Sequence, residues 1–233
     1  VAEKIPIHAV LVTHNHYDHL DYDSISDIAK IGKKTIFVVP LGLRAWFEQH
    51  IPLSHNEVVE MDWHETIKIK SDDLQPGIQN VEAEIEISAV PMQHWSSRRG
   101  FDRDETLWCG YSLAANTNTK KDSCKVLFAG DTGMFDGLHE IGEKYGPYDL
   151  AAIPIGAYEP RDFMKGQHTN PEDAVEMMRA IQARKAVPIH WGTFQLTFEP
   201  VLEPRERLIK AVKQANLPQD SFSPWLIGST IVC

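Results

Sequence analysis

A short apolar segment near the start of the chain leads directly into a dense group of potential metal ligands. The apolar segment runs from Ala9 to Val12 and has the composition of a buried β-strand. Three histidines and one aspartate follow within six positions: His14, His16, Asp18 and His19. Imidazole and carboxylate groups bind zinc-type ions, whereas structural zinc sites favour cysteine, which this group lacks. The segment therefore predicts a catalytic metal site at a strand end; a structural site and a solvated polar loop are the alternatives.

Strand-like and helix-like segments alternate along the chain, and the first half is richer in strands. Strands are expected at residues 7–12, 35–39, 58–61, 66–69, 81–90, 107–115, 125–129, 149–153, 186–189 and 225–232. Helices are expected at 22–31, 41–50, 135–145, 170–183 and 204–215, and loops at 72–80 and 116–122. Since no repeat or linker interrupts this pattern, one α/β domain covering residues 1–233 is expected.

Four later polar residues share one feature, which is that each follows a predicted strand. These residues are His94, Asp131, His168 and His190. In α/β sheets, the strand ends on one side form the crevice in which ligands bind. We therefore expect these side chains to converge on the histidine and aspartate group near the start, although they are distant in sequence.

Composition and charge narrow the classes of partner. The chain has 33 acidic and 23 basic residues and a net charge of -10, whereas non-specific binding to nucleic acid needs a basic surface. Nucleic acid is therefore not an expected partner. The three cysteines, Cys109, Cys124 and Cys233, show no C-x-x-C spacing and are expected to be buried, reduced thiols in an intracellular compartment. No apolar run approaches the ~20 residues of a membrane-spanning helix.

The motifs resemble those of a known superfamily. Thr13-His-Asn-His-Tyr-Asp-His19 matches the H-x-H-x-D-H signature of the metallo-β-lactamase superfamily, and His94, Asp131 and His190 match its remaining ligand positions in order. Three further segments resemble the phospholipase D branch that hydrolyses N-acyl-phosphatidylethanolamine. They are Ala151-Ala-Ile-Pro-Ile-Gly-Ala-Tyr-Glu-Pro160, Gln167-His168 and Ile189-His-Trp-Gly-Thr-Phe194. The resemblance extends from about Ala9 to Leu208.

This resemblance implies a fold, a metal centre and an activity. The fold would be a four-layer αββα sandwich with two zinc ions between its sheets. By position, one zinc ion would be bound by His14, His16 and His94, the other by Asp18, His19 and His190, with Asp131 bridging the two. The activity that the resemblance implies is hydrolysis of N-acyl-phosphatidylethanolamine to N-acylethanolamine and phosphatidic acid. Paired metal ions are suited to such a reaction, because they stabilise both the attacking and the leaving oxygen of a phosphodiester.

The resemblance also suggests roles for residues near the ligands. His168 is expected to be catalytic, contacting the phosphate or assisting proton transfer, and Gln167 is expected to orient it. Asp21 is expected to accept the second ring N–H of a ligand histidine. Arg98 and Arg99 could meet a lipid headgroup or lie in a solvated loop. For Leu43, Trp46 and Phe47, core packing of a helix is favoured over an acyl-binding groove.

The start of the chain departs from the superfamily pattern. Only thirteen residues precede His14, whereas members of the superfamily carry several strands before this signature. The expected domain is therefore N-terminally incomplete, lacking its first strands, with an unpaired sheet edge. A phospholipid substrate, peripheral membrane contact and a homodimer are expected for the complete protein. The alternatives are another hydrolase of this fold, such as a lactonase or a nuclease, or a truncated relic that binds metal or lipid without turnover.

Overall fold

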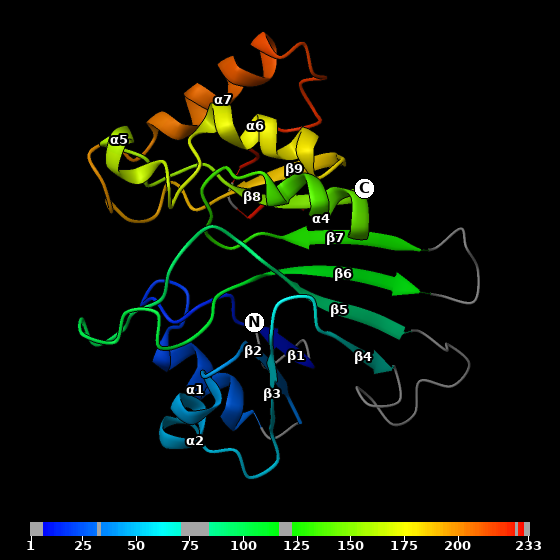
Figure 1. The fold of residues 1–233 in the computed structure, drawn as a ribbon, viewed down its shortest axis with the longest axis vertical. Coiled ribbons are helices and arrows are strands. Elements are labelled where there is room, and N and C mark those ends of the chain that lie inside the picture. The colour runs from blue at the N-terminus through cyan, green and yellow to red at the C-terminus, as the bar shows by residue number, and fades with distance from the viewer. Residues whose placement is uncertain (1–6, 32–33, 71–83, 117–122, 227, 231–233) are drawn as a thin grey trace.

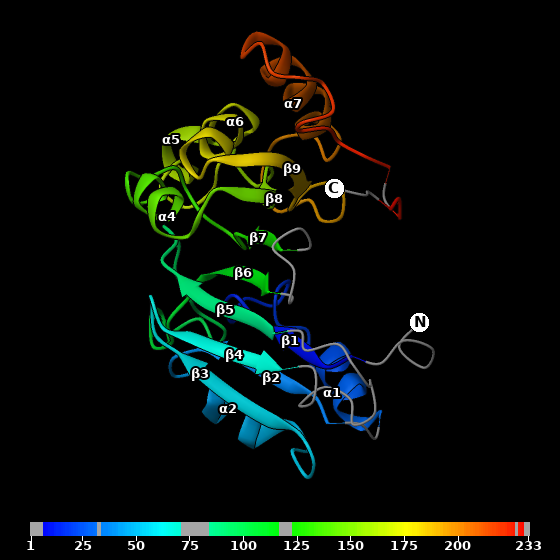
Figure 2. The same ribbon diagram turned by 90° about the vertical axis from the view of Figure 1, so that its right-hand side faces the viewer.

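The computed structural model describes residues 7–31, 34–70, 84–116, 123–226 and 228–230. Two sheets form its centre (Figures 1 and 2). The smaller sheet is parallel and has the order β1-β2-β3, with β1 at Ala9–Leu11, β2 at Ile36–Pro40 and β3 at Glu57–Met61. The larger sheet has the order β4-β5-β6-β7-β8-β9, formed by Thr66–Lys70, Glu84–Val90, Gly110–Asn116, Cys124–Phe128, Tyr148–Pro154 and Ala183–Ile189. Its strands β4 to β7 are antiparallel, and β7 to β9 are parallel.

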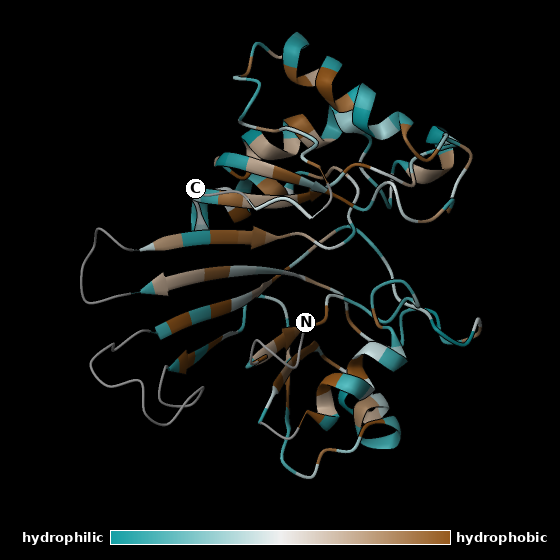
Figure 3. Cartoon of the chain, turned by 180° about the vertical axis from the view of Figure 1, so that it is seen from behind, coloured by the Kyte–Doolittle hydropathy of each residue, from teal (hydrophilic) through white to brown (hydrophobic). Residues whose placement is uncertain are grey.

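Helices cover the outer face of each sheet. Those on the smaller sheet are α1 (Tyr22–Lys30) and α2 (Arg44–His50), which share an apolar cluster with β2. Those on the larger sheet are α4 (Gly137–Tyr145), α6 (Pro171–Ala180) and α7 (Glu203–Gln214), with the short α5 (Arg161–Met164) nearby. The helices carry both hydrophilic and hydrophobic residues, as expected for elements with one buried face (Figure 3).

A third apolar cluster lies between the two sheets. Its members come from β2 and β3 on one side and from β4, β5 and β6 on the other, and include Val38, Met61, Ile87 and Tyr111. All five residues of β2 are buried, as is usual for a parallel strand covered on both faces. The order of layers is therefore helix, sheet, sheet, helix, which confirms the αββα architecture.

Hydrogen bonds across this interface fix the two sheets relative to each other. The buried Tyr111 hydroxyl lies 2.9 Å from the Val12 carbonyl oxygen and 3.2 Å from that of Val38. The backbone N–H of Cys109 donates to the Thr13 carbonyl at 2.9 Å. Since Val12 and Thr13 directly precede the first ligand group, these bonds hold the end of β1 against the larger sheet.

Several predicted element boundaries need correction. The helix predicted at 41–50 begins only at Arg44, because Leu41 still donates to the Met61 carbonyl and Gly42 has a φ of +88°. The helix predicted at 170–183 starts as expected, with the Asn170 side chain capping it, but ends at Ala180. Gln182 has a φ of +57° and reverses the chain into β9.

The strand predicted at 225–232 is wrong in the described part of that segment. The chain pairs with β9 only at an isolated bridge between Phe222 and Ala186, and no strand follows it among residues 225–226 and 228–230. Pro224 removes a backbone donor and Gly228 has a φ of +89°, so neither favours a continued ladder.

Other expectations fall partly or wholly outside the described residues. The loop at 72–80, the first part of the strand at 81–90, most of the loop at 116–122 and Cys233 lie outside them. Cys109 is buried as predicted, whereas Cys124 is exposed, so the prediction is wrong for that residue. Among the described residues, no helix has both the length and the apolar character needed to cross a membrane.

Candidate metal centre

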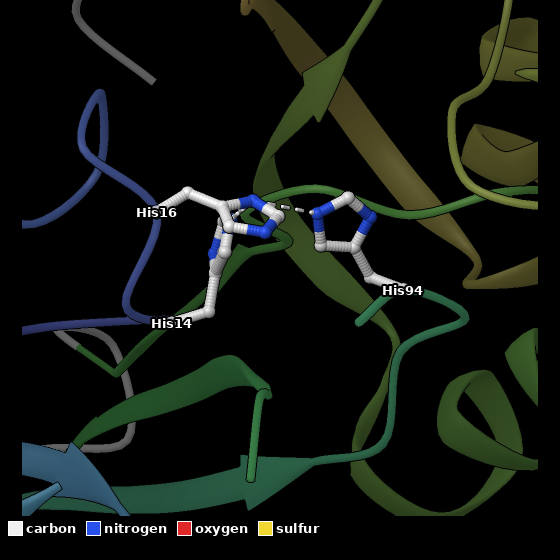
Figure 4. A group of neighbouring side chains, drawn as sticks. All are labelled: His14, His16 and His94. Carbon is white, nitrogen blue, oxygen red and sulfur yellow. Dashed lines mark hydrogen bonds between the residues drawn. The ribbon is translucent and has the colours of Figure 1, made fainter. Parts of the chain in front are cut away.

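Three histidine rings, from two loops that are far apart in the sequence, face one another in the structure (Figure 4). His14 and His16 follow β1, and His94 follows β5. The Nδ1 atom of His16 lies 3.0 Å from His14 Nε2 and 3.3 Å from His94 Nε2. Three ring nitrogens that converge in this way form one candidate ion site.

A second group lies beside the first and contains both carboxylates. The Asp18 Oδ2 atom lies 3.3 Å from His19 Nε2 and 3.4 Å from His190 Nε2. The Asp131 Oδ2 atom lies 3.1 Å and 3.2 Å from the same two nitrogens. These four side chains form a second candidate site, in which His190 is supplied by the end of β9.

The position of Asp131 connects the two groups. Besides its contacts in the second group, its Oδ2 atom lies 3.9 Å from His14 Nε2 and 3.7 Å from His94 Nε2. Asp131 is buried and follows β7, between the loops that carry the other ligands. One carboxylate thus faces both groups, which is the geometry required of a bridging ligand.

His168 is buried beside both groups. Its Nδ1 atom lies 4.0 Å from Asp131 Oδ2, and its ring centroid lies 5.1 Å from that of His94 and 5.3 Å from that of His190. The described residues show no hydrogen bond between the Gln167 and His168 side chains. Instead, the backbone carbonyl of Gln167 lies 3.0 Å from His94 Nδ1 and accepts its ring N–H.

Unpartnered atoms at the centre test whether the residues fit metal ions. His19 Nε2 and His190 Nε2 lie close to Asp131 Oδ2, yet neither makes a hydrogen bond, and Asp131 Oδ1 also has no partner. Buried polar atoms are nearly always hydrogen-bonded. Nitrogen and oxygen atoms that point into a shared space without bonding one another fit ligands of a common ion, and this donor set suits zinc.

The electrostatics of four histidines favour neutral rings. Burial lowers the pKa of His14 and His16, and it lowers the pKa of His94 to about 3 and that of His168 to about 4, although the Asp131 carboxylate opposes the shift. A histidine must be neutral to bind a metal ion. The three rings of the first group are thus already in the required state.

The two histidines of the second group differ from those of the first, because their pKa values are raised rather than lowered. Burial disfavours charged rings there too, but the Asp131 and Asp18 carboxylates outweigh it and raise the pKa of His19 to about 9 and that of His190 to about 10. Those histidines in turn hold the pKa of both carboxyl groups below the usual range, despite their burial. In the metal-free protein, protons on these rings therefore balance the carboxylates, and a bound cation would displace them.

Neighbouring groups determine which ring nitrogen of His14 and of His94 faces the centre. The Thr13 hydroxyl lies 3.0 Å from His14 Nδ1, and the Gln167 carbonyl occupies the same position at His94, so the Nε2 atoms of both rings point inward.

The prediction that Asp21 serves a ligand histidine is wrong. Its carboxylate instead accepts from the Ser24 backbone N–H at 2.9 Å and caps α1.

The loops that carry His94, Asp131 and His168 are bonded to one another. The backbone N–H of Gln93 donates to the Thr132 hydroxyl at 3.0 Å, and that of Thr169 donates to the Thr132 carbonyl at 2.8 Å. Thr132 is fully buried. It therefore ties together the loops of the ligands His94 and Asp131 and the loop of His168, a role that the sequence motif alone did not indicate.

Close backbone approach also shapes the centre at His190. This residue has a φ of +60°, which is unusual for a side chain with a Cβ atom. A Cβ atom placed on Gly156 would lie only 2.0 Å from the His190 carbonyl oxygen. A glycine at the end of β8 is therefore needed for the end of β9 to bring His190 into the site.

Gly130, directly before Asp131, gives a test of this tight packing. It has a φ of +63°, and an added Cβ would lie 2.8 Å from the Thr13 side chain, which contacts His14. We expect Gly130→Ala to destabilise the fold by roughly 2–3 kcal/mol, from backbone strain together with the clash. Chemical denaturation would measure this change. The control is Gly100→Ala, where φ is +80° but no atom lies within 4 Å, so that it carries the backbone cost alone. Equal destabilisation by both variants would contradict the clash.

A cavity of about 290 Å³ opens beside the second group of ligands. Asp18, His19 and His190 line one side of it. The rest of its lining is mostly apolar: Phe128, Ile189, Trp191, Phe194 and Leu196, with Thr193. Phe194 and Leu196 are more than half exposed, at 60% and 52%. The centre thus borders a cavity whose remaining wall is mostly apolar.

Three other residues considered from the sequence lie in the helix layer. Leu43 and Phe47 are buried in the cluster between α2 and the smaller sheet, and Trp46 packs partly against it. The prediction of core packing is confirmed for Leu43 and Phe47, whereas Trp46 is partly buried and also lines a hollow beside Arg98.

Comparisons with known proteins agree with this geometry. The family model described as Beta-lactamase superfamily domain matches residues 2–191. N-acyl-phosphatidylethanolamine-hydrolyzing phospholipase D 1 of Caenorhabditis elegans is 41% identical over 202 residues, which are 85% of this chain and 52% of that protein. The mitochondrial N-acyl-phosphatidylethanolamine-hydrolyzing phospholipase D of Saccharomyces cerevisiae is 36% identical over 222 residues, 93% of this chain and 43% of that protein. The chain thus spans about half the length of these relatives.

More distant proteins share the fold. A UPF0173 metal-dependent hydrolase of Thermococcus onnurineus is 27% identical over 192 residues, 82% of this chain and 70% of that protein. Among solved structures, the metallo hydrolase Igni18 of Ignicoccus hospitalis has a TM-score of 0.64 at 22% identity, covering 96% of this chain and 78% of its own. An isothiocyanate hydrolase from Delia radicum gut bacteria has a TM-score of 0.66 at 17% identity, covering 100% of this chain and 80% of its own.

Proposed function

The chain belongs to the β-lactamase superfamily, and on that basis we propose that it carries the catalytic centre of a zinc-dependent phosphodiesterase of the phospholipase D type. The proposed reaction hydrolyses N-acyl-phosphatidylethanolamine to N-acylethanolamine and phosphatidic acid. The observation that carries the proposal is the seven-residue nitrogen and oxygen centre that opens onto an apolar cavity. The two relatives that bear this activity in their names support the choice of substrate.

Two zinc ions would be held by the residues already described. His14, His16 and His94 would bind one, Asp18, His19 and His190 the other, and Asp131 would contact both. Bound zinc ions supply positive charge for phosphate oxygens and acidify a water molecule. The carboxylates and the neutral rings of this chain would hold that positive charge in place beside the substrate.

His168 is the residue best placed to act on the reacting groups without being needed as a ligand. Its buried Nδ1 atom has no hydrogen-bond partner and faces the centre next to Asp131. During hydrolysis the phosphorus–oxygen bond to the ethanolamine breaks, and that oxygen must receive a proton. We assign His168 to hold the phosphate or transfer this proton, and we assign Gln167 to position His94 through its backbone carbonyl.

The substrate also needs room for its acyl chains. The cavity residues Phe194 and Leu196 provide an apolar wall beside the centre, and the chain that follows them also exposes Phe198 and Leu202. Contact of that loop with a phospholipid surface would let the substrate enter without leaving an apolar environment. Peripheral membrane association, an intracellular site, a homodimer and a single domain over residues 1–233 belong to the same proposal.

The test is turnover of N-acyl-phosphatidylethanolamine in detergent micelles by purified protein, alongside elemental analysis. We expect about two zinc ions per chain and release of N-acylethanolamine that a chelator abolishes and added zinc restores. Zinc present without such release, but with hydrolysis of a lactone or a generic phosphodiester, would favour another metal-dependent hydrolase, as in the Thermococcus relative. Absence of zinc binding would instead indicate a relic without turnover.

A further inference from the structure

Arg98 lies outside the metal centre but contacts the segment that carries most of its ligands. Arg98 belongs to the loop that follows His94, and its side chain is half-buried. A single guanidinium nitrogen, Nη1, donates to the Asn15 carbonyl at 3.1 Å and to the Leu20 carbonyl at 2.8 Å. Both hydrogens of that nitrogen are therefore used by the backbone of a segment about eighty residues earlier in the chain.

The two carbonyls bracket three metal ligands. His16, Asp18 and His19 all lie between Asn15 and Leu20. Within this bracket, the described backbone bonds are those from His19 and Leu20 to the His16 carbonyl, at 3.1 Å and 2.9 Å. These local bonds close one turn but do not tie the turn to the rest of the protein. The bonds from Arg98 join its two ends to the opposite loop.

The Arg98 side chain is itself held on both sides. Its guanidinium carbon lies 4.2 Å from the centroid of the Tyr17 ring and 5.0 Å from that of the Trp46 ring. A cation over aromatic faces is attracted by their electron density, and the stem of arginine packs against apolar surface at the same time. These rings keep the guanidinium plane oriented toward the two carbonyls.

A buried carboxylate shapes the loop from which Arg98 extends. Asp102 is 5% exposed, and it accepts hydrogen bonds from the Arg98 N–H at 2.9 Å, the Arg99 N–H at 2.8 Å and the Ser97 hydroxyl at 2.8 Å. Three donors on one carboxylate fix the turn that directly follows the ligand His94. This turn begins three residues after His94 and presents Arg98 to the segment that carries His16, Asp18 and His19.

We propose that Arg98 is a positioning residue that couples the loop of His94 to the loop of His16, Asp18 and His19. By fixing the distance between these two loops, it holds the ligands that they carry in the arrangement that binds metal ions. This inference rests on the metal centre of the proposed function. It gives Arg98 a role inside the protein, through the two hydrogen bonds of Nη1, that is separate from binding a lipid headgroup.

The test compares zinc release from zinc-loaded protein into a coloured chelator, well below the melting temperature. Arg98→Met keeps the apolar stem between Tyr17 and Trp46 but removes the donors, and should release zinc roughly tenfold faster. Arg98→Lys keeps one charged donor and should lie between Arg98→Met and the wild type. The matched control is Arg184→Met, because Arg184 pairs with Asp149 near the start of β9, at the opposite end of that strand from His190. Its release rate should equal that of the wild type.

A second variant distinguishes coupling from general destabilisation. Asp102→Asn leaves the Arg98 side chain in place but weakens the turn that presents it, so zinc release should accelerate less than in Arg98→Met. The double variant should release zinc no faster than Arg98→Met alone, because both changes act through the same contact. Additive effects of the two changes, or a rise in release that merely follows the fall in melting temperature, would overturn the coupling.

Failure of this inference can be told apart from failure of the proposed function. If the wild-type chain binds no zinc, the proposed function fails before Arg98 is tested. If the wild type binds zinc and Arg98→Met releases it at the wild-type rate, the positioning role is wrong. A raised KM for the phospholipid with unchanged zinc release would assign Arg98 to the headgroup and would overturn the inference as well.

Discussion

Replacing Asp131 with asparagine is expected to remove bound zinc and to lower turnover about a thousandfold, several kcal/mol of transition-state stabilisation. The reason is the shared position of its Oδ2 atom, which lies 3.1 to 3.9 Å from the Nε2 atoms of His14, His19, His94 and His190. The amide has the same shape but no charge, so two ions would be held close together without the anion between them. Elemental analysis and turnover of the same preparation would measure both losses.

The control for this substitution is Asp136→Asn. Asp136 is exposed, lies five residues further along the chain and makes no side-chain cap to α4, so zinc content and turnover should be unchanged. In metal-free protein, Asp131→Asn should also lower the pKa of His19 and His190 from about 9 and about 10, because it removes one of the carboxylates that raise them. Full zinc occupancy in Asp131→Asn would contradict the bridging role.

The convergence of the ligands could be predicted from where polar residues follow strands. His94, Asp131 and His190 each lie directly beyond the end of a strand of the larger sheet, and the sheet order places those ends at one edge. Apolar periodicity locates the strands themselves well enough to show that these polar residues follow them, even where the last residue of a strand is misplaced. The structure brings all three side chains to the histidines that follow β1.

The groups that orient the ligands were harder to predict, because several of them are backbone atoms. The Gln167 carbonyl bonds to His94, and the Asn15 and Leu20 carbonyls bond to Arg98. Every residue has a carbonyl, so no residue type marks these positions in a sequence. Asp21 shows the converse error: its carboxylate was near the ligands in sequence, but the start of α1 offered it a closer partner.

The predicted ends of some helices and strands were wrong where the conformation of one residue overrides the apolar pattern. The helix α6 stops before Ile181 although its apolar spacing continues, because Gln182 turns the chain into a strand that pairs with β8. Likewise, the apolar residues after Phe222 resemble a strand, but among the described residues of this segment only Phe222 itself pairs with the larger sheet, through one bridge to Ala186. In both cases tertiary pairing, which is not local in sequence, decides the outcome.

Replacing His168 with alanine is expected to reduce turnover by a factor of about 10²–10⁴ while leaving the zinc content unchanged. His168 lies beside both ligand groups, yet without it the first group has three histidines and the second has two histidines and two carboxylates. The alanine variant keeps the backbone bonds of this residue, from its N–H to the Met164 carbonyl and from Arg161 Nη1 to its own carbonyl. Loss of the His168 imidazole should therefore lower turnover of the phosphodiester without disturbing the fold. Turnover at saturating substrate, with zinc analysis of the same sample, measures this effect.

The pattern of losses then separates three roles for His168. A fall in zinc content parallel to the fall in turnover would make it a metal ligand, consistent with its grouping with His94 and Asp131 but not with a catalytic role. Unchanged turnover at full zinc content would mean that the buried ring only fills space next to His190. The exposed His139 on α4 provides the matched control, since His139→Ala removes an imidazole remote from the ligand loops and should change neither quantity. Only a loss of turnover at constant zinc, absent from this control, assigns the proton or the phosphate contact to His168.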